Sequence, residues 1–199
     1  MVDTNPGQQT PSIRAEQAQM VTNRIIAAAI AQIEAGTEPS MRAVAIRARI
    51  AERTLYRYFP SLEALQAATM PHLRRLVGYP MCNTADELPV YVKQLFTRFQ
   101  SSSALSRVLA TAPWAAPILR QTRTESRDRL LDVLKAAFPD VPRADIESAT
   151  AGLRVPLSAA GWIYLEDCGY DLRASIRHVQ WLVKTVLDHL QHLQEKKHA

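Results

Sequence analysis

The sequence predicts an all-α fold, and three observations support this prediction. Apolar residues recur at three- and four-residue spacing along most of the 199-residue chain, which is the periodicity of amphipathic helices. No alternating apolar and polar run is bounded by the turn signals that a strand needs. Apolar residues make up 47% and charged residues 22% of the chain, enough for a sizeable core. We therefore expect disorder only at the polar, proline-containing start.

The first part of the chain is predicted to form helices over about residues 14–35, 41–48 and 52–58, and a fourth up to residue 76. Gly36 supplies the left-handed stop of the first helix, and Ser40 is suited to cap the second. Residues 49–51 form a break, and Ser61 caps the fourth helix after Pro60. The predicted division is a flexible tail (1–13), a three-helix domain (14–60) with its central motif at about 40–59, and a larger helical domain (61–199).

Five further helices are predicted at about residues 88–102, 104–112, 114–137, 143–168 and 172–196. Pro156 lies inside the fourth of these and is expected to kink it. The last helix carries a heptad seam, and Trp181, Leu182 and Leu187 widen its apolar face. The seam consists of Leu172, Ile176, Val179, Val183, Val186, Leu190 and Leu193. This face is either one broad core surface or is shared between the chain's own domain and a second copy.

The sequence indicates a cytoplasmic protein with no membrane segment. The longest uncharged stretch has 12 residues, fewer than the roughly 18 that cross a bilayer, and the first residues do not resemble a signal peptide. Cys82 and Cys168 are isolated and are expected to stay reduced. Common catalytic signatures are absent, and Asp188, His189 and His192 fall short of a full zinc ligand set. We expect no enzyme activity, no cofactor and no bound metal.

Positive charge is concentrated in one short segment, because residues 40–58 carry +4 of the formal net charge of +5. This segment is a short helix, a three-residue break and a second short helix, the arrangement of a helix-turn-helix, whose second helix enters the DNA major groove. The apolar positions that would hold both helices against the first are Val44, Ala45, Ile50, Leu55 and Phe59. The candidates to face DNA are Arg42, Arg47, Glu52, Arg53, Thr54, Tyr56, Arg57 and Tyr58.

Two stretches carry a more specific pattern and read RIIAAAIAQIEAG (24–36) and MRAVAIRARIAERTLYRYFPSLEALQAA (41–68). The Ala-rich first helix, the VA pair and TLYRYF followed by S-x-E-x-L resemble the DNA-binding domain of the tetracycline-repressor (TetR) family of bacterial regulators. The resemblance implies that Arg42 and Arg53 read bases. The full set of DNA contacts that it implies is Ser40, Arg42, Glu52, Arg53, Thr54, Tyr56, Arg57 and Tyr58.

Three positions depart from the family pattern. Arg49 stands where the turn normally has glycine, and a non-glycine residue held left-handed there costs roughly 1–2 kcal/mol. Ala51 replaces the usual serine cap of the second helix of the motif, a loss of about 1 kcal/mol. Leu62 replaces a lysine expected to contact phosphate. Arg47 and Arg49 are expected to restore the lost positive charge.

The resemblance further implies that the larger domain binds a small-molecule effector and dimerises through its last two long helices. Candidate effector contacts, for each of which plain core packing is the alternative, are Tyr91, Leu95, Phe99, Trp114, Leu119 and Trp162. They indicate a hydrophobic or aromatic effector. Arg120, Arg123 and Arg127 either pair an anionic group or form a solvated face. Candidate dimer contacts are Leu153, Leu157, Gly161, Ile176, Val179, Val183, Val186 and Leu190.

The sequence thus favours a homodimeric transcriptional repressor that binds a near-palindromic, double-stranded DNA operator and is released by its effector. The first alternative is an all-helical small-molecule-binding or scaffold protein whose degenerate helix-turn-helix no longer binds DNA. A small-molecule enzyme is the second alternative.

Overall fold

The computed structural model describes residues 13–198 apart from 78, 79 and 81, and within these residues it contains helices and no strands. The predicted all-α class is therefore confirmed. The predicted tail lies outside the described residues except for Ile13, which begins the first helix. The chain divides into two compact units, Met1–Gln32 with Pro39–Thr69, and Ile33–Glu38 with Met70–Ala199.

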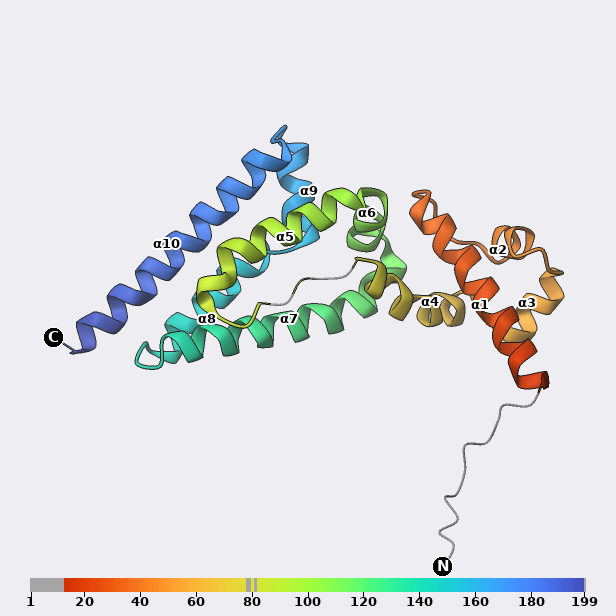
Figure 1. Ribbon diagram of the computed structural model, residues 1–199, viewed down its shortest axis with the longest axis horizontal. Helices are drawn as coiled ribbons and strands as arrows, with labels where there is room; N and C mark the ends of the chain where they lie inside the picture. The colour runs from red at the N-terminus through yellow and green to blue at the C-terminus, as the bar shows by residue number, and fades with distance from the viewer. Residues whose placement is uncertain (1–12, 78–79, 81, 199) are drawn as a thin grey trace, which may run out of the picture. The chain divides into compact units, whose positions relative to one another are not determined.

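The first unit is built around α1 (Ile13–Glu34), with α2 (Met41–Arg47) and α3 (Glu52–Tyr58) packed beside it (Figure 1). Gly36 follows α1 with a φ of +77°, the predicted left-handed stop. The unit continues to Thr69, past the predicted boundary at residue 60, because Leu62 and Leu65 of α4 (Leu62–Val77) pack in its core. Ser61 caps α4 as predicted and accepts a hydrogen bond from the Ala64 N–H at 3.2 Å.

The second unit contains the longer helices. In Figure 1, α5 (Leu88–Ser101) runs along α10 (Leu172–His198), and α7 (Ala116–Ala137) runs along α8 (Arg143–Arg154). The shorter α6 (Ser103–Thr111) contacts α9 (Ala159–Asp167), and two 3-10 turns, η1 (Ala85–Glu87) and η2 (Pro113–Ala115), precede α5 and α7. Phe96, Phe99, Leu134, Ile146 and Trp162 are fully buried in the shared core.

The prediction of one kinked helix over residues 143–168 is wrong. The structure has two helices, because α8 ends at Arg154 and α9 begins at Ala159. Ser158 caps α9 and accepts a hydrogen bond from the Gly161 N–H at 3.2 Å, so a new start signal follows Pro156. Gly161 is required at this junction, since a Cβ there would collide with the Val155 carbonyl oxygen.

Candidate nucleic-acid interface and effector cavity

The positions of α2 and α3 are set by the apolar face that the sequence predicted. Val44, Ala45, Leu55 and Phe59 are buried in one core, which they share with four residues of α1 and with others, and Ile50 packs against it. The α1 contribution is Ile25, Ile26, Ala28 and Ala29. Because each of these short helices buries only one face, the opposite face is left to solvent.

The predicted DNA contacts lie mostly on that solvent face. Arg42, Arg47, Glu52, Arg53, Tyr56 and Arg57 are exposed, and Tyr56 retains 47% of its surface although it is aromatic. Thr54 is half-buried. Tyr58 packs partly against the core, with the Arg57 guanidinium carbon 5.6 Å from its ring centroid. The surface therefore presents four arginines, Arg42, Arg47, Arg53 and Arg57, from two adjacent helices.

Ser40 caps the N-terminus of α2, as predicted. Its hydroxyl accepts a hydrogen bond from the Ala43 N–H at 3.3 Å, and its own N–H donates to the Gln32 side-chain oxygen at 3.4 Å. Ser40 is exposed, so the capping hydroxyl is also accessible from solvent. These bonds fix where α2 begins relative to α1 and therefore how its arginines are presented.

The turn between α2 and α3 is a Schellman motif with arginine in the position that favours glycine. Arg49 has a φ of +52°, as the family pattern led us to expect. The Ile50 N–H donates to the Ala45 carbonyl and the Arg49 N–H to the Ile46 carbonyl, both at 3.1 Å. The turn geometry of the motif is therefore kept despite the left-handed arginine, which stores backbone strain.

Replacing Arg49 with glycine is expected to stabilise the protein relative to Arg49→Ala by about 1 kcal/mol, because alanine keeps the left-handed strain and glycine removes it. Both variants lose the same exposed charge, so the comparison isolates the backbone. Urea unfolding followed by circular dichroism measures the difference. Equal free energies of unfolding for the two variants would show that the turn is not strained.

The other two departures from the family pattern also have structural consequences. Ala51 is the N-cap residue of α3 and makes no side-chain capping bond, as predicted. Leu62 begins α4 and packs partly against the core of the first unit, so this position contributes apolar contact where the family pattern has a charge. On the solvent face of the motif, positive charge comes from the arginines of α2, α3 and the turn.

The second unit contains a cavity with two lobes, of about 220 Å³ and about 70 Å³. Both lobes are lined by Tyr91, Thr122, Ser126, Arg154 and Leu157, from α5, α7, α8 and the segment after it. Four of the predicted effector contacts line the cavity, namely Tyr91, Leu95, Phe99 and Leu119. Trp114 and Trp162 are not among its lining residues, and Trp162 instead packs in the core against Phe99 at a ring distance of 5.8 Å.

The lining is more polar than the sequence led us to expect. It includes Arg123, Arg129 and Arg154 beside Glu125, and the hydroxyls of Ser106, Thr122 and Ser126. Sequence reasoning missed Arg154 and Ser106. Ile146, Thr150 and Arg154 follow one another at four-residue intervals and therefore share one face of α8. Because Ile146 and Thr150 are buried, this spacing could have indicated that Arg154 points inward as well.

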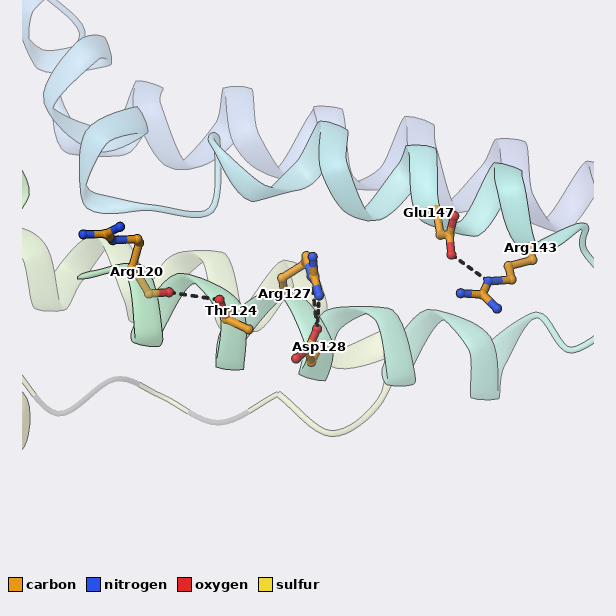
Figure 2. Close-up of polar contacts among 6 residues, drawn as sticks. All are labelled: Arg120, Thr124, Arg127, Asp128, Arg143 and Glu147. Atoms are coloured by element: carbon orange, nitrogen blue, oxygen red, sulfur yellow. Dashed lines mark hydrogen bonds and ion pairs between the residues drawn. The ribbon is translucent and has the colours of Figure 1, made fainter. Parts of the chain in front are cut away.

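The three arginines singled out on α7 have different surroundings. Figure 2 shows Arg127 paired with Asp128, with the Nη2 and Oδ1 atoms 2.8 Å apart, and Arg143 paired across one turn of α8 with Glu147. The Arg143 guanidinium lowers the pKa of Glu147. Arg120 is exposed, and its carbonyl oxygen accepts a hydrogen bond from Thr124. Of the three, only Arg123 lines the cavity.

The two cysteines are expected to differ in reactivity. Cys82 lines the larger lobe and is buried, which raises the pKa of its thiol to about 11, whereas Cys168 is exposed. At pH 8 we expect Cys82 to be alkylated at least ~100-fold more slowly than a free cysteine, with a rate that rises about tenfold per pH unit up to pH 10. Iodoacetamide labelling of Cys82→Ser and Cys168→Ser variants separates the two thiols. Rapid labelling of Cys82 at neutral pH would contradict its burial.

The predicted dimer residues lie largely on the inner face of their helices. Leu153, Leu157, Val179, Val183 and Leu190 are buried in the core of the single chain, and Gly161 is buried against the segment 155–156. Ile176 and Val186 are half-buried and pack against the same core. The heptad seam of α10 therefore packs within its own domain, chiefly along α5.

The outer face of α9 and α10, together with the segment that precedes α9, carries a groove of apolar residues. Its most exposed members are Val155 (66%), Tyr164 (67%) and Trp181 (69%), and Leu182 lies beside them. Large aromatic residues this exposed are unusual on a surface that contacts only water. We refer to Val155, Tyr164, Trp181 and Leu182 as the outer apolar face.

The described residues include no helix long and apolar enough to span a membrane. The same residues contain no group of three or more His, Cys, Asp or Glu side chains arranged to hold a metal ion, and Asp188, His189 and His192 are exposed on α10.

Comparison with known proteins connects this geometry to a family. Residues 25–69 match the model described as bacterial regulatory proteins, tetR family, so the predicted resemblance is confirmed over the helix-turn-helix. A comparison with curated protein sequences finds no match. Among the solved structures that share the fold, two have a TM-score of 0.52 each.

One of these structures is the multidrug binding protein EbrR complexed with imidazole, at 15% identity over 83% of this chain and 93% of that chain. The other is a TetR-like transcriptional regulator from Rhodococcus sp. RHA1, at 19% identity over 91% of this chain and 99% of that chain. At these identities the likeness concerns the fold, which extends over both units.

Proposed function

We propose that this chain, which carries the tetR-family DNA-binding domain at residues 25–69, is a ligand-responsive transcriptional repressor. In this proposal it binds a near-palindromic operator as a homodimer and is released by a small effector. The observation that carries the proposal is the solvent face of α2 and α3, where Arg42, Arg47, Arg53, Arg57 and Tyr56 are exposed together on helices held rigidly by a buried core.

The DNA-binding step uses this face in two ways. Arg53 lies in the first turn of α3, the end of a recognition helix that contacts base edges, so it is suited to bidentate contact with guanine. Arg42 and Tyr56 are the other candidate base readers. Arg47 and Arg57 supply positive charge for phosphates, which position the protein without reading sequence.

The dimer is proposed to form through the outer apolar face. Val155, Tyr164, Trp181 and Leu182 offer an exposed surface that a second copy can bury by two-fold symmetry. The heptad seam of α10 contributes to the proposed dimer only indirectly, because its burial against α5 leaves Trp181 on the outer side of the helix. Two recognition helices would then enter successive major grooves about 34–36 Å apart.

The cavity in the second unit is the proposed effector site. An effector can release DNA only if it binds more tightly to the conformation whose recognition helices no longer fit the operator. The lining, with Leu95, Phe99 and Leu119 beside several polar groups, supports binding of a small organic molecule.

Selection of bound fragments from a genomic DNA library tests the proposal. The native protein, with competitor DNA present, is expected to enrich a two-fold-symmetric sequence, and the Arg53→Ala, Tyr56→Ala double variant is expected to enrich none. If the native protein enriches no sequence at low or moderate salt, the repressor proposal fails. A helical small-molecule-binding protein would then be the better description.

A further inference from the structure

One of the residues shared by the two lobes of the cavity is an arginine. Arg154 lines both lobes and stands at the last turn of α8, where the chain leaves the helix. Its side chain is half-buried, and this burial lowers the pKa of the guanidinium. Removing a cation from water is unfavourable unless an anion or several acceptors replace the lost hydration.

The protein itself offers Arg154 little compensation. The groups that act on it electrostatically are the Tyr91 phenol and the Arg123 guanidinium, and no carboxylate of the described residues is among them. The second arginine therefore adds repulsion. Glu125, the acidic residue of the lining, accepts a hydrogen bond from Gln121 at 2.9 Å. The centre of the cavity is consequently a positive site in a partly apolar enclosure.

A hydrogen-bond donor lies in the smaller lobe beside the two arginines. Ser106 is only 2% exposed, and its hydroxyl has no hydrogen-bond partner among the described residues. Serine in a helix commonly bonds to its own backbone, as Ser126 does here with the Thr122 carbonyl at 2.7 Å. A buried hydroxyl without such a bond is unfavourable, and a ligand oxygen would satisfy it.

One part of the lining of the smaller lobe is apolar and suits a hydrocarbon body. Leu95, Phe99, Leu109 and Leu119 surround it, and Leu157 lines both lobes. The volumes of about 220 Å³ and about 70 Å³ limit the ligand to a small molecule. A phosphate-rich or strongly hydrated anion would lose its water against these residues without replacement.

We propose that the cavity binds a small amphipathic carboxylate, whose head group pairs with Arg154 and Arg123 and accepts a hydrogen bond from Ser106, and whose apolar body packs on the leucines and Phe99. The inference rests on the proposed function, because this carboxylate would be the effector. It also specifies the expected hydrophobic or aromatic effector as an anion with a hydrophobic body. Guanidinium and carboxylate form the strongest paired hydrogen bonds available to such a site.

The test compares carboxylates with their uncharged isosteres. The full-length protein is titrated calorimetrically with aliphatic and aromatic monocarboxylates of six to ten carbons, such as octanoate and 4-phenylbutyrate, and with the corresponding primary amides. We expect at least one carboxylate to bind at least ~10-fold more tightly than its amide, and Arg154→Gln to lower that carboxylate's affinity by ~10- to 100-fold. The affinity for the amide should change little.

Three variants keep the result interpretable. Arg154→Lys keeps the charge and is expected to retain part of the affinity for the carboxylate. Arg123→Gln changes an exposed residue, so it should weaken carboxylate binding without affecting the fold. Arg120→Gln removes an exposed arginine three residues away on α7 that is not among the lining residues, and should leave binding unchanged. Thermal unfolding of each variant verifies that it is folded.

Alkylation of Cys82 reports on the larger lobe, because this thiol lines that lobe and none of the proposed carboxylate contacts lines that lobe alone. A carboxylate held in the smaller lobe should leave the alkylation rates of Cys82 and of the exposed Cys168 unchanged. The inference is overturned if none of the carboxylates binds at millimolar concentration, if amides bind equally well, or if Arg154→Gln leaves carboxylate affinity intact. The repressor proposal fails separately. It fails if the protein forms no specific DNA complex, or if a carboxylate binds but does not weaken the operator complex.

Discussion

Replacing Arg53 and Tyr56 with alanine is expected to lower operator affinity by at least ~100-fold while leaving the fold intact. Both side chains are exposed on α3, and neither contributes to the core formed by Leu55 and Phe59. A good bidentate contact between arginine and guanine contributes about 1–3 kcal/mol of discrimination, and a dimer makes it twice. Fluorescence anisotropy with the selected operator, at fixed salt concentration, measures the loss.

Two further variants separate sequence reading from simple loss of charge. Arg57→Ala is expected to weaken binding to all sequences alike and to reduce the salt dependence of the affinity by about one phosphate contact per chain. Arg98→Ala removes one exposed arginine from α5, in the second unit, and should change specific binding little. If the double variant kept the preference for operator over random DNA, α3 would not be the recognition helix.

The helix-turn-helix could be predicted closely because its structure is encoded locally. The spacing of Val44, Ala45, Leu55 and Phe59 fixes which face is buried, and capping by Ser40 fixes the start of α2. The left-handed Arg49 could also be anticipated, because the resemblance to the TetR family places the glycine of the turn at this position.

The break between α8 and α9 was mispredicted for an equally local reason. Pro156 can either kink a continuous helix or end it, and the apolar spacing on both sides of it favours the kink. Ser158 decides the outcome, because its side chain caps a new helix and its hydroxyl also donates to the Val155 carbonyl at 2.6 Å. The small residue Gly161 then allows α9 to approach this segment closely.

The cavity could be predicted only in part, because its lining is assembled from helices distant in sequence. Tyr91, Phe99 and Leu119 could be named in advance because the resemblance implies a cavity between the helices that carry them. Spacing does not show whether a buried face meets another helix or an empty space, so Trp162 was assigned to the cavity although it packs in the core. Arg154 is a polar residue on an otherwise buried face of α8. Its role in the proposed site depends on Arg123 and Ser106, which line the same cavity from other helices.

The heptad seam of α10 shows a similar limit. The spacing of Val179, Val183 and Leu190 correctly indicates a buried stripe, but periodicity does not identify what buries it. In the structure the stripe packs within the chain, and Trp181, which lies outside the heptad pattern, is left exposed. The residues outside the repeat are therefore the better indicators of a surface for a second copy.

Replacing Trp181 with glutamate is accordingly expected to dissociate the proposed dimer. A tryptophan at the centre of an interface commonly contributes 2 kcal/mol or more, and a carboxylate buried in its place is strongly unfavourable, so the dimer dissociation constant should rise by at least ~100-fold. Light scattering after size exclusion should change from twice the chain mass of 22.3 kDa to the mass of one chain. The fold should persist because Trp181 is 69% exposed in the single chain.

Thr97→Glu, which adds the same charge at an exposed position of α5, serves as the matched control and should stay dimeric. Operator affinity of Trp181→Glu should fall by ~100-fold or more, since a monomer loses the gain of binding two half-sites at once, while its affinity for a single half-site is unchanged. This pattern differs from that of the Arg53 and Tyr56 variant, which remains dimeric but loses the half-site itself. A native protein that is monomeric at micromolar concentration, or a Trp181→Glu variant that remains dimeric, would exclude the outer apolar face as the dimer interface.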